Sequence, residues 1–161
     1  MNPSTVLITG ANRGLGLKFT ELYAQKNFQV IATCRDIDSA DQLTSMANRY
    51  SNIQILTLDV VQSESIQMLA DKLKGLPIDI LINNAGIWRS SSLGSVNKEA
   101  WLESFTTNTI APYEIACTFL PHIIDGVLKK VVSVTSKMGS IDDNTSGGSY
   151  IYRSSKSALN M

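Results

Sequence analysis

The chain has 161 residues, which is enough for one domain with a substantial core, and its 14 basic and 14 acidic residues give a formal net charge of zero. This balance, without basic or acidic runs, argues against a nucleic-acid-binding protein and against a strongly charged partner. The two cysteines, Cys34 and Cys117, are too few for a disulfide framework and predict buried thiols in a reducing compartment.

We expect a soluble, cytoplasmic protein. The N-terminal residues lack the charged region and long apolar run of a signal peptide. No apolar run approaches the roughly 20 residues of a transmembrane helix. The single histidine, His122, has no nearby cysteine, so we predict no metal site and expect a helix-terminus role for this residue.

Five short runs rich in Ile, Val and Leu alternate with segments of helical periodicity. Because these runs are apolar on both faces, they predict buried parallel strands. The first predicted helix has an apolar face made of Leu15, Phe19, Leu22 and Tyr23, and the last is one long helix over residues 98–120. The predicted strands cover residues 6–10, 29–33, 53–58, 78–83 and 130–135.

The alternation predicts an α/β fold with a doubly wound parallel sheet, of the Rossmann type with three αβα layers. Residues 1–161 would form a single nucleotide-binding domain. In such a sheet, loops at the carboxyl ends of the strands form the ligand crevice. The loops over residues 86–97 and 137–149 follow the fourth and fifth predicted strands, so we expect both at that crevice.

The stretch TGANRGLG, residues 9–16, follows the first predicted strand and opens the first helix. Gly10 permits a tight turn, while Gly14 and Gly16 let the backbone approach a pyrophosphate at a helix N-terminus. The spacing Gly-x-x-x-Gly-x-Gly differs from the commoner Gly-x-Gly-x-x-Gly. A glycine-rich turn without a ligand remains the alternative interpretation.

Two arginines suggest which nicotinamide cofactor would bind. Arg35 follows the second strand, where NAD sites place an acid, and Arg13 lies in the glycine turn. Two guanidinium groups suit a 2′-phosphate, so we predict NADP(H) rather than NAD(H), although Asp36 next to Arg35 weakens the inference. Asp59 after the third strand could accept from an adenine amino group, or it could only close a turn.

Tyr152 and Lys156 stand four residues apart and share one face of a predicted helix. A nearby ammonium stabilises a phenolate and makes tyrosine a useful proton donor, although this pair also arises by chance. Ser136 ends the fifth strand, where its hydroxyl could polarise a carbonyl or serve only as a turn residue. Pro112 cannot bond the carbonyl of Asn108, so we expect a helix kink with a free acceptor for a water molecule.

These motifs occur in a fixed order, namely TGANRGLG, LDV, NNAG, an Asn in the long helix, Ser136 and YRSSK. Together they resemble the short-chain dehydrogenase/reductase family over essentially the whole chain, and more finely its carbonyl-reductase-like branch of C-factor and sniffer proteins. The resemblance implies that Tyr152 is the general acid, Lys156 binds the nicotinamide ribose, Ser136 orients the substrate carbonyl and Asn108 holds a relay water. The cofactor, NADP(H), would supply the hydride.

The predicted site therefore has a catalytic part and a cofactor part. The catalytic part consists of Ser136, Tyr152, Lys156 and Asn108. The cofactor part consists of Gly10, Asn12, Arg13, Gly14, Leu15, Gly16, Arg35, Asp59, Val60, Asn83, Asn84, Ala85, Gly86, Tyr152 and Lys156.

The sequence departs from the family pattern in two places. Ser136 and Tyr152 lie sixteen positions apart, a few more than the plainest family members have. The chain ends five residues after Lys156, whereas family members continue with the rest of this helix, further strands and a substrate lid. We therefore expect that Met161 is not the natural terminus and that the 161 residues alone are inactive.

Three functions remain open at this stage. An NADP(H)-dependent carbonyl reductase or alcohol dehydrogenase, acting on a small molecule, is favoured by the intact Ser, Tyr and Lys. A non-catalytic NADP-binding signalling or regulatory protein would use the same fold. A nucleotide-sugar epimerase shares Tyr-x-x-x-Lys, but its Gly-x-x-Gly-x-x-Gly motif is absent. The family resemblance makes the long helix and the Tyr152/Lys156 helix a candidate homo-oligomer face.

Overall fold

A computed structural model describes residues 3–161, which form one five-stranded parallel sheet. The strand order is β3-β2-β1-β4-β5, so the direction of winding reverses between β1 and β4. The predicted doubly wound α/β fold is confirmed, with strand ends shifted by a few residues. The strands are β1 (Thr5–Ile8), β2 (Gln29–Cys34), β3 (Ile53–Thr57), β4 (Ile80–Asn83) and β5 (Lys130–Ser133).

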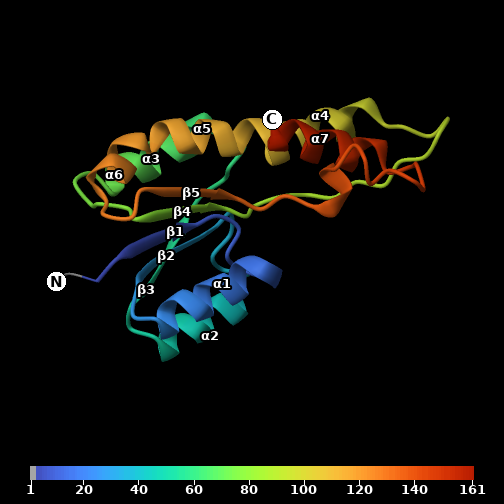
Figure 1. Cartoon of the computed structure of the whole chain (residues 1–161). Coiled ribbons are helices and arrows are strands. Elements are labelled where there is room, and N and C mark those ends of the chain that lie inside the picture. The colour runs from blue at the N-terminus through green and yellow to red at the C-terminus, as the bar shows by residue number, and fades with distance from the viewer. Residues whose placement is uncertain (1–2) are drawn as a thin grey trace.

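Helices cover both faces of the sheet, which gives the three predicted layers. Figure 1 shows α1 and α2 on one face and α3, α5 and α6 on the other, with α4 and α7 beyond the carboxyl end of β5. The helical elements are α1 (Gly14–Gln25), α2 (Asp41–Arg49), α3 (Ser63–Lys72), α4 (Lys98–Phe105), the π turn η1 (Thr106–Ile110), α5 (Ala111–Thr118), α6 (Leu120–Asp125), the 3-10 turn η2 (Lys137–Gly139) and α7 (Tyr150–Asn160).

The core has two parts because each central strand sends alternate side chains to opposite faces. Leu7 of β1 joins the cluster under α3, α5 and α6, whereas Val6 and Ile8 join the cluster under α1 and α2. All three side chains are fully buried. The outer strand β5 differs, because Val131 and Val132 are exposed at the sheet edge.

Helix α1 buries a different face from the one that its large residues predicted. Leu15 is 61% exposed and Leu22 is 41% exposed, while Gly16, Thr20 and Ala24 are buried. The reason is close approach to the sheet, since a side chain at Gly16 would collide with the carbonyl oxygen of Gly10. Small residues therefore form the contact face.

The single long helix predicted over residues 98–120 is interrupted. Helix α4 leads into the π turn η1, and the chain continues as α5 and α6 to Asp125. Pro112 lies in the first turn of α5, and its missing N–H would belong to the bond with the Asn108 carbonyl. The wide turn accommodates this loss, so the predicted interruption is confirmed while the predicted helix end was too early.

Asp79 fastens the opposite edge of the sheet, where the strands begin. Its Oδ2 accepts from the Thr5 N–H over 2.8 Å, and its Oδ1 accepts from the N–H groups of Val127 and Leu128 over 2.8 and 3.0 Å. Burial opposes ionisation of this carboxyl, but the three N–H donors outweigh it, and the pKa of Asp79 lies below its usual range. The carboxylate joins β1 to the connection between α6 and β5.

The two cysteines differ in environment. Cys34 is buried, as predicted, and burial raises the pKa of its thiol. The prediction of a buried thiol at Cys117 is wrong, because this residue lies on the outer side of α5. His122 lies in the last turn of α6, and its Nε2 is 3.2 Å from the Ala70 carbonyl. None of the described helices is long and apolar enough to span a membrane.

Candidate active site at the carboxyl edge of the sheet

The glycine turn and the NNAG segment form one hydrogen-bonded unit. The Asn84 side chain donates to the carbonyls of Thr9 and Gly10 over 2.9 and 3.0 Å. The Thr9 hydroxyl oxygen accepts from the N–H groups of Asn84 and Ala85, both over 3.0 Å. Thr9 is itself buried and was not among the predicted site residues. The only sequence signal for it was its place as the first residue of TGANRGLG.

The glycine turn fits a pyrophosphate. Gly10 and Gly14 have positive φ angles of 65° and 56°, which favour glycine. A Cβ built on Gly14 would meet nothing within 4 Å, so space is open beside the first turn of α1. This helix has no side-chain cap and no acidic residue in its first turn. Its first N–H groups and the positive end of its dipole therefore face that space, next to Asn12 and Leu15.

Both arginines predicted to recognise a 2′-phosphate belong to the same corner. The Ala11 N–H donates to the Thr33 carbonyl over 2.8 Å, which holds the glycine turn against the end of β2. Arg13 and Arg35 are exposed, and neither takes part in an ion pair within residues 3–161. Neighbouring Asp36 uses Oδ1 to accept from the Asp38 N–H over 3.1 Å, so this carboxylate is engaged in a local turn.

Asp59 and Asn83 have local structural contacts. Asp59 Oδ1 accepts from the Val61 N–H over 3.2 Å, and Val60 between them is half-buried. Asn83 is buried and its Nδ2 donates to the Pro112 carbonyl over 3.2 Å. Asn83 thus joins β4 to α5 and supports the strand, whereas Asn84 is the NNAG side chain that reaches the glycine turn.

Lys156 is the buried cation of the site. Its side chain is 5% exposed, and Nζ donates to the Val134 carbonyl over 2.8 Å. Nζ lies 5.9 Å from the centre of the Tyr152 ring, and a Cβ built on Gly86 would stand 3.7 Å from it. Burial lowers the pKa of Lys156. An ammonium has three donors, and the Val134 carbonyl is its one hydrogen-bond partner among the described residues, so two donors remain for a ligand.

Ser136 combines a turn role with a free donor. Its Oγ accepts from the Met138 N–H over 3.1 Å at the start of η2, which leaves the hydroxyl proton available. The turn η2 packs on α7, because Ser157 Oγ and Asn160 Nδ2 both donate to the Gly139 carbonyl, over 3.0 and 3.1 Å. The segment that carries Ser136 is thereby fixed to the helix that carries Tyr152 and Lys156.

Asn108 lies fully buried in the π turn. Its Oδ1 accepts from the Ile87 N–H over 2.8 Å, and its Nδ2 donates to the Ile87 carbonyl over 2.9 Å and to Ser155 Oγ over 3.0 Å. The predicted water on the Asn108 backbone carbonyl is a separate matter, since these contacts involve the side chain. Ser155 was not predicted, because a serine inside a helix pattern carries no signal of its buried partners.

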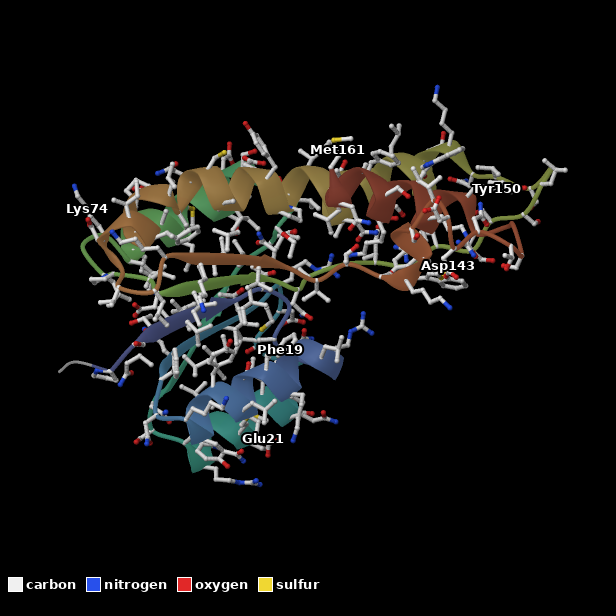
Figure 2. The ribbon with its side chains drawn as sticks, viewed as in Figure 1. Phe19, Glu21, Lys74, Asp143, Tyr150 and Met161 are labelled. Atoms are coloured by element: carbon white, nitrogen blue, oxygen red, sulfur yellow. The ribbon has the colours of Figure 1, made fainter. Side chains whose placement is uncertain are left out.

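The two loops predicted at the crevice meet at the start of α7. Ser91 accepts from the N–H groups of Ser149 and Ile151 over 2.9 and 3.1 Å, through its carbonyl and its hydroxyl respectively. Arg153 donates to the Asp143 carbonyl over 3.3 Å, which holds the longer loop. Figure 2 shows Asp143 and Tyr150 at the same end of the molecule, opposite Lys74. The described residues thus bring the predicted catalytic groups to one edge.

Comparisons with known proteins agree with this geometry. The short chain dehydrogenase family matches over residues 4–161. An NADPH-bound carbonyl reductase from chicken fatty liver is 36% identical with a TM-score of 0.91, and the match covers 100% of this chain and 71% of that chain. Carbonyl reductase Sniffer of D. melanogaster is 34% identical with a TM-score of 0.89, over 99% of this chain and 72% of that chain.

A curated relative gives a higher identity over a shorter span. C-signal of Myxococcus xanthus is 46% identical over 88 residues, which are 53% of this chain and 52% of that protein. The match thus spans about half the length of C-signal. The chain belongs to the short chain dehydrogenase family, and these likenesses place it in the carbonyl-reductase-like branch.

Proposed function

We propose that the protein is an NADP(H)-dependent oxidoreductase that reduces a carbonyl compound or oxidises the matching alcohol. The observation that carries this proposal is the buried Lys156 ammonium beside the Tyr152 ring, at the sheet edge that also holds the glycine turn. A buried, underused lysine is rare without a partner, and a cofactor ribose supplies the hydroxyl groups that would engage it. The likeness to a carbonyl reductase solved with NADPH supports the choice of cofactor.

The residues divide the work between binding and proton transfer. The first turn of α1 would hold the pyrophosphate, and Arg13 and Arg35 would hold the 2′-phosphate. The bound nicotinamide supplies the hydride. Tyr152 would donate a proton to the carbonyl oxygen, while the free proton of the Ser136 hydroxyl would polarise the same oxygen. The Lys156 cation beside the phenol stabilises the phenolate that results.

Replacing Tyr152 by Phe tests the proposal most simply, because it removes only the proton-donating hydroxyl. The native full-length Tyr152→Phe variant should lose NADPH-dependent carbonyl reduction by a factor of at least about 10² and keep NADPH affinity. Tyr150→Phe is the matched control, since Tyr150 lies on the same helix and is exposed. Near-normal turnover by Tyr152→Phe would show that another group is the acid.

A non-catalytic nucleotide-binding protein of signalling or regulation is the second candidate, and the likeness to a protein named C-signal favours it. The complete set of Ser136, Tyr152 and Lys156 favours an enzyme, because nucleotide binding alone needs no proton donor. The two candidates differ in one measurement. A binder would take up NADPH and leave it unoxidised with every carbonyl substrate offered, whereas the enzyme would oxidise it.

A further inference from the structure

A buried hydrogen-bond chain joins the π turn η1 to the helix that carries Tyr152 and Lys156. Asn108 Nδ2 donates to Ser155 Oγ over 3.0 Å, and Ser155 Oγ donates to the Tyr152 carbonyl over 2.9 Å. The side chains of Asn108 and Ser155 are both fully buried. Buried polar groups of this kind are costly unless every partner is in place, so the chain fixes the relative position of the two elements.

The direction of this chain is set by Ile87. Asn108 faces both backbone groups of Ile87, accepting from the N–H and donating to the carbonyl. Turning the amide over would place two donors together and two acceptors together. The second Nδ2 proton must therefore go to the Ser155 oxygen, and the Ser155 hydroxyl proton is left to bond the Tyr152 carbonyl.

A second contact holds the same residue from its backbone. Thr109 Oγ1 donates to the Ser155 carbonyl over 2.8 Å, so consecutive residues of the π turn hold both the side chain and the main chain of Ser155. In an α-helix the Tyr152 carbonyl also accepts from the Lys156 N–H. The hydroxyl of Ser155 thus acts on the one helical turn that spaces Tyr152 from Lys156.

We propose that Ser155 is a positioning residue for the reaction described above, acting with Thr109. Together they hold the Tyr152–Lys156 turn against η1, so that the phenol and the ammonium keep their places beside Gly86. This inference rests on the proposed function. A misplacement of about 1 Å in a reacting group can cost on the order of 10²-fold in rate. The glycine turn is built from other elements and would bind the cofactor as before.

The test uses Ser155→Ala in the native full-length protein. We expect kcat for carbonyl reduction to fall about tenfold to a hundredfold, with the KM for NADPH within about twofold of wild type. We also expect the Ile87 amide, followed by NMR, to exchange with solvent faster, because Asn108 loses its buried acceptor. Thr109→Val removes one hydroxyl with little change in shape and should lower kcat less, which provides a second variant if Ser155→Ala folds poorly.

Ser154→Ala is the matched control. Its hydroxyl bonds the Tyr150 carbonyl and accepts from the Trp101 indole over 2.8 Å, so it lies on the same helix without touching η1. We expect its kcat and its Ile87 exchange to match wild type. Unchanged kcat in both Ser155→Ala and Thr109→Val would overturn the inference and leave the proposed function standing. A wild-type protein that binds NADPH without turnover would instead overturn the proposed function, and with it the positioning role.

Discussion

Lys156 carries most of the chemical information at the scale of single residues. Lysine side chains are seldom buried, and burial here lowers the pKa because the ammonium loses water. One carbonyl, that of Val134, replaces part of that water. The remaining donors point to a ligand that brings its own acceptors, which is the property expected of a ribose in the proposed cofactor.

Arg35 provides a residue-scale prediction about cofactor choice. Arg35→Ala should weaken NADPH binding about tenfold to a hundredfold and leave NADH binding nearly unchanged, because only NADPH carries the 2′-phosphate that a guanidinium can bind. Isothermal titration of both cofactors into the native full-length protein measures this. Arg49→Ala, on the exposed side of α2, is the matched control. Equal losses for both cofactors, or tighter NADH binding by wild type, would remove the basis for the NADP(H) preference.

Some site residues could be predicted from the sequence and some could not. Tyr152, Lys156 and the glycines stand at fixed spacings that chemistry requires, so the pattern alone indicates them. Thr9 and Ser155 act through buried hydrogen bonds to residues 75 and 47 positions away. A hydroxyl has no periodicity or spacing that reveals such partners, so only the folded arrangement identifies them.

Elements were predictable where hydrophobic periodicity decided them. All five strands follow from their apolar runs, because both faces of a central parallel strand are buried. Helix α1 is different, since its small residues rather than its large ones face the sheet. Periodicity of large apolar residues fails where the backbone must approach closely at Gly16. The end of the long helix was also missed, because α6 follows α5 with hardly a break.

Asp79 gives an element-scale prediction, because it joins β1 to the α6–β5 connection. Asp79→Asn should lower the free energy of unfolding by about 1–3 kcal/mol near neutral pH, since an amide cannot accept from all three N–H donors. The pKa of Asp79 is lower in the folded state than the ordinary value of about 3.9. Its contribution is therefore complete above that value and is lost as the pH falls through the folded pKa.

Urea unfolding of wild type and Asp79→Asn at several pH values measures this contribution. The stability difference between the two should shrink as the pH is lowered below about 4. Asp125→Asn serves as the control, because Asp125 is an exposed carboxylate at the end of the neighbouring helix α6. A difference that stayed constant with pH would show that the ionised carboxylate is not the stabilising species.

At the scale of the whole molecule, the two edges of the sheet have different tasks. The amino edge is fastened by Asp79, whereas the carboxyl edge collects the glycine turn, the NNAG segment, Ser136, the π turn and the Tyr152/Lys156 helix. The reversal of strand order between β1 and β4 creates room for a ligand at the second edge. The central claim is that a nicotinamide cofactor and a carbonyl substrate meet there.

Transfer of isotope from cofactor to product tests this claim most directly. The native full-length protein would be incubated with NADPH deuterated at the transferable position of the nicotinamide ring and with a panel of aliphatic and aromatic aldehydes and ketones. The account predicts an alcohol that carries deuterium on the former carbonyl carbon, seen by mass spectrometry, and no such product from Tyr152→Phe. NADPH binding without labelled alcohol from any member of the panel, or equal labelling by the Tyr152→Phe variant, would contradict it.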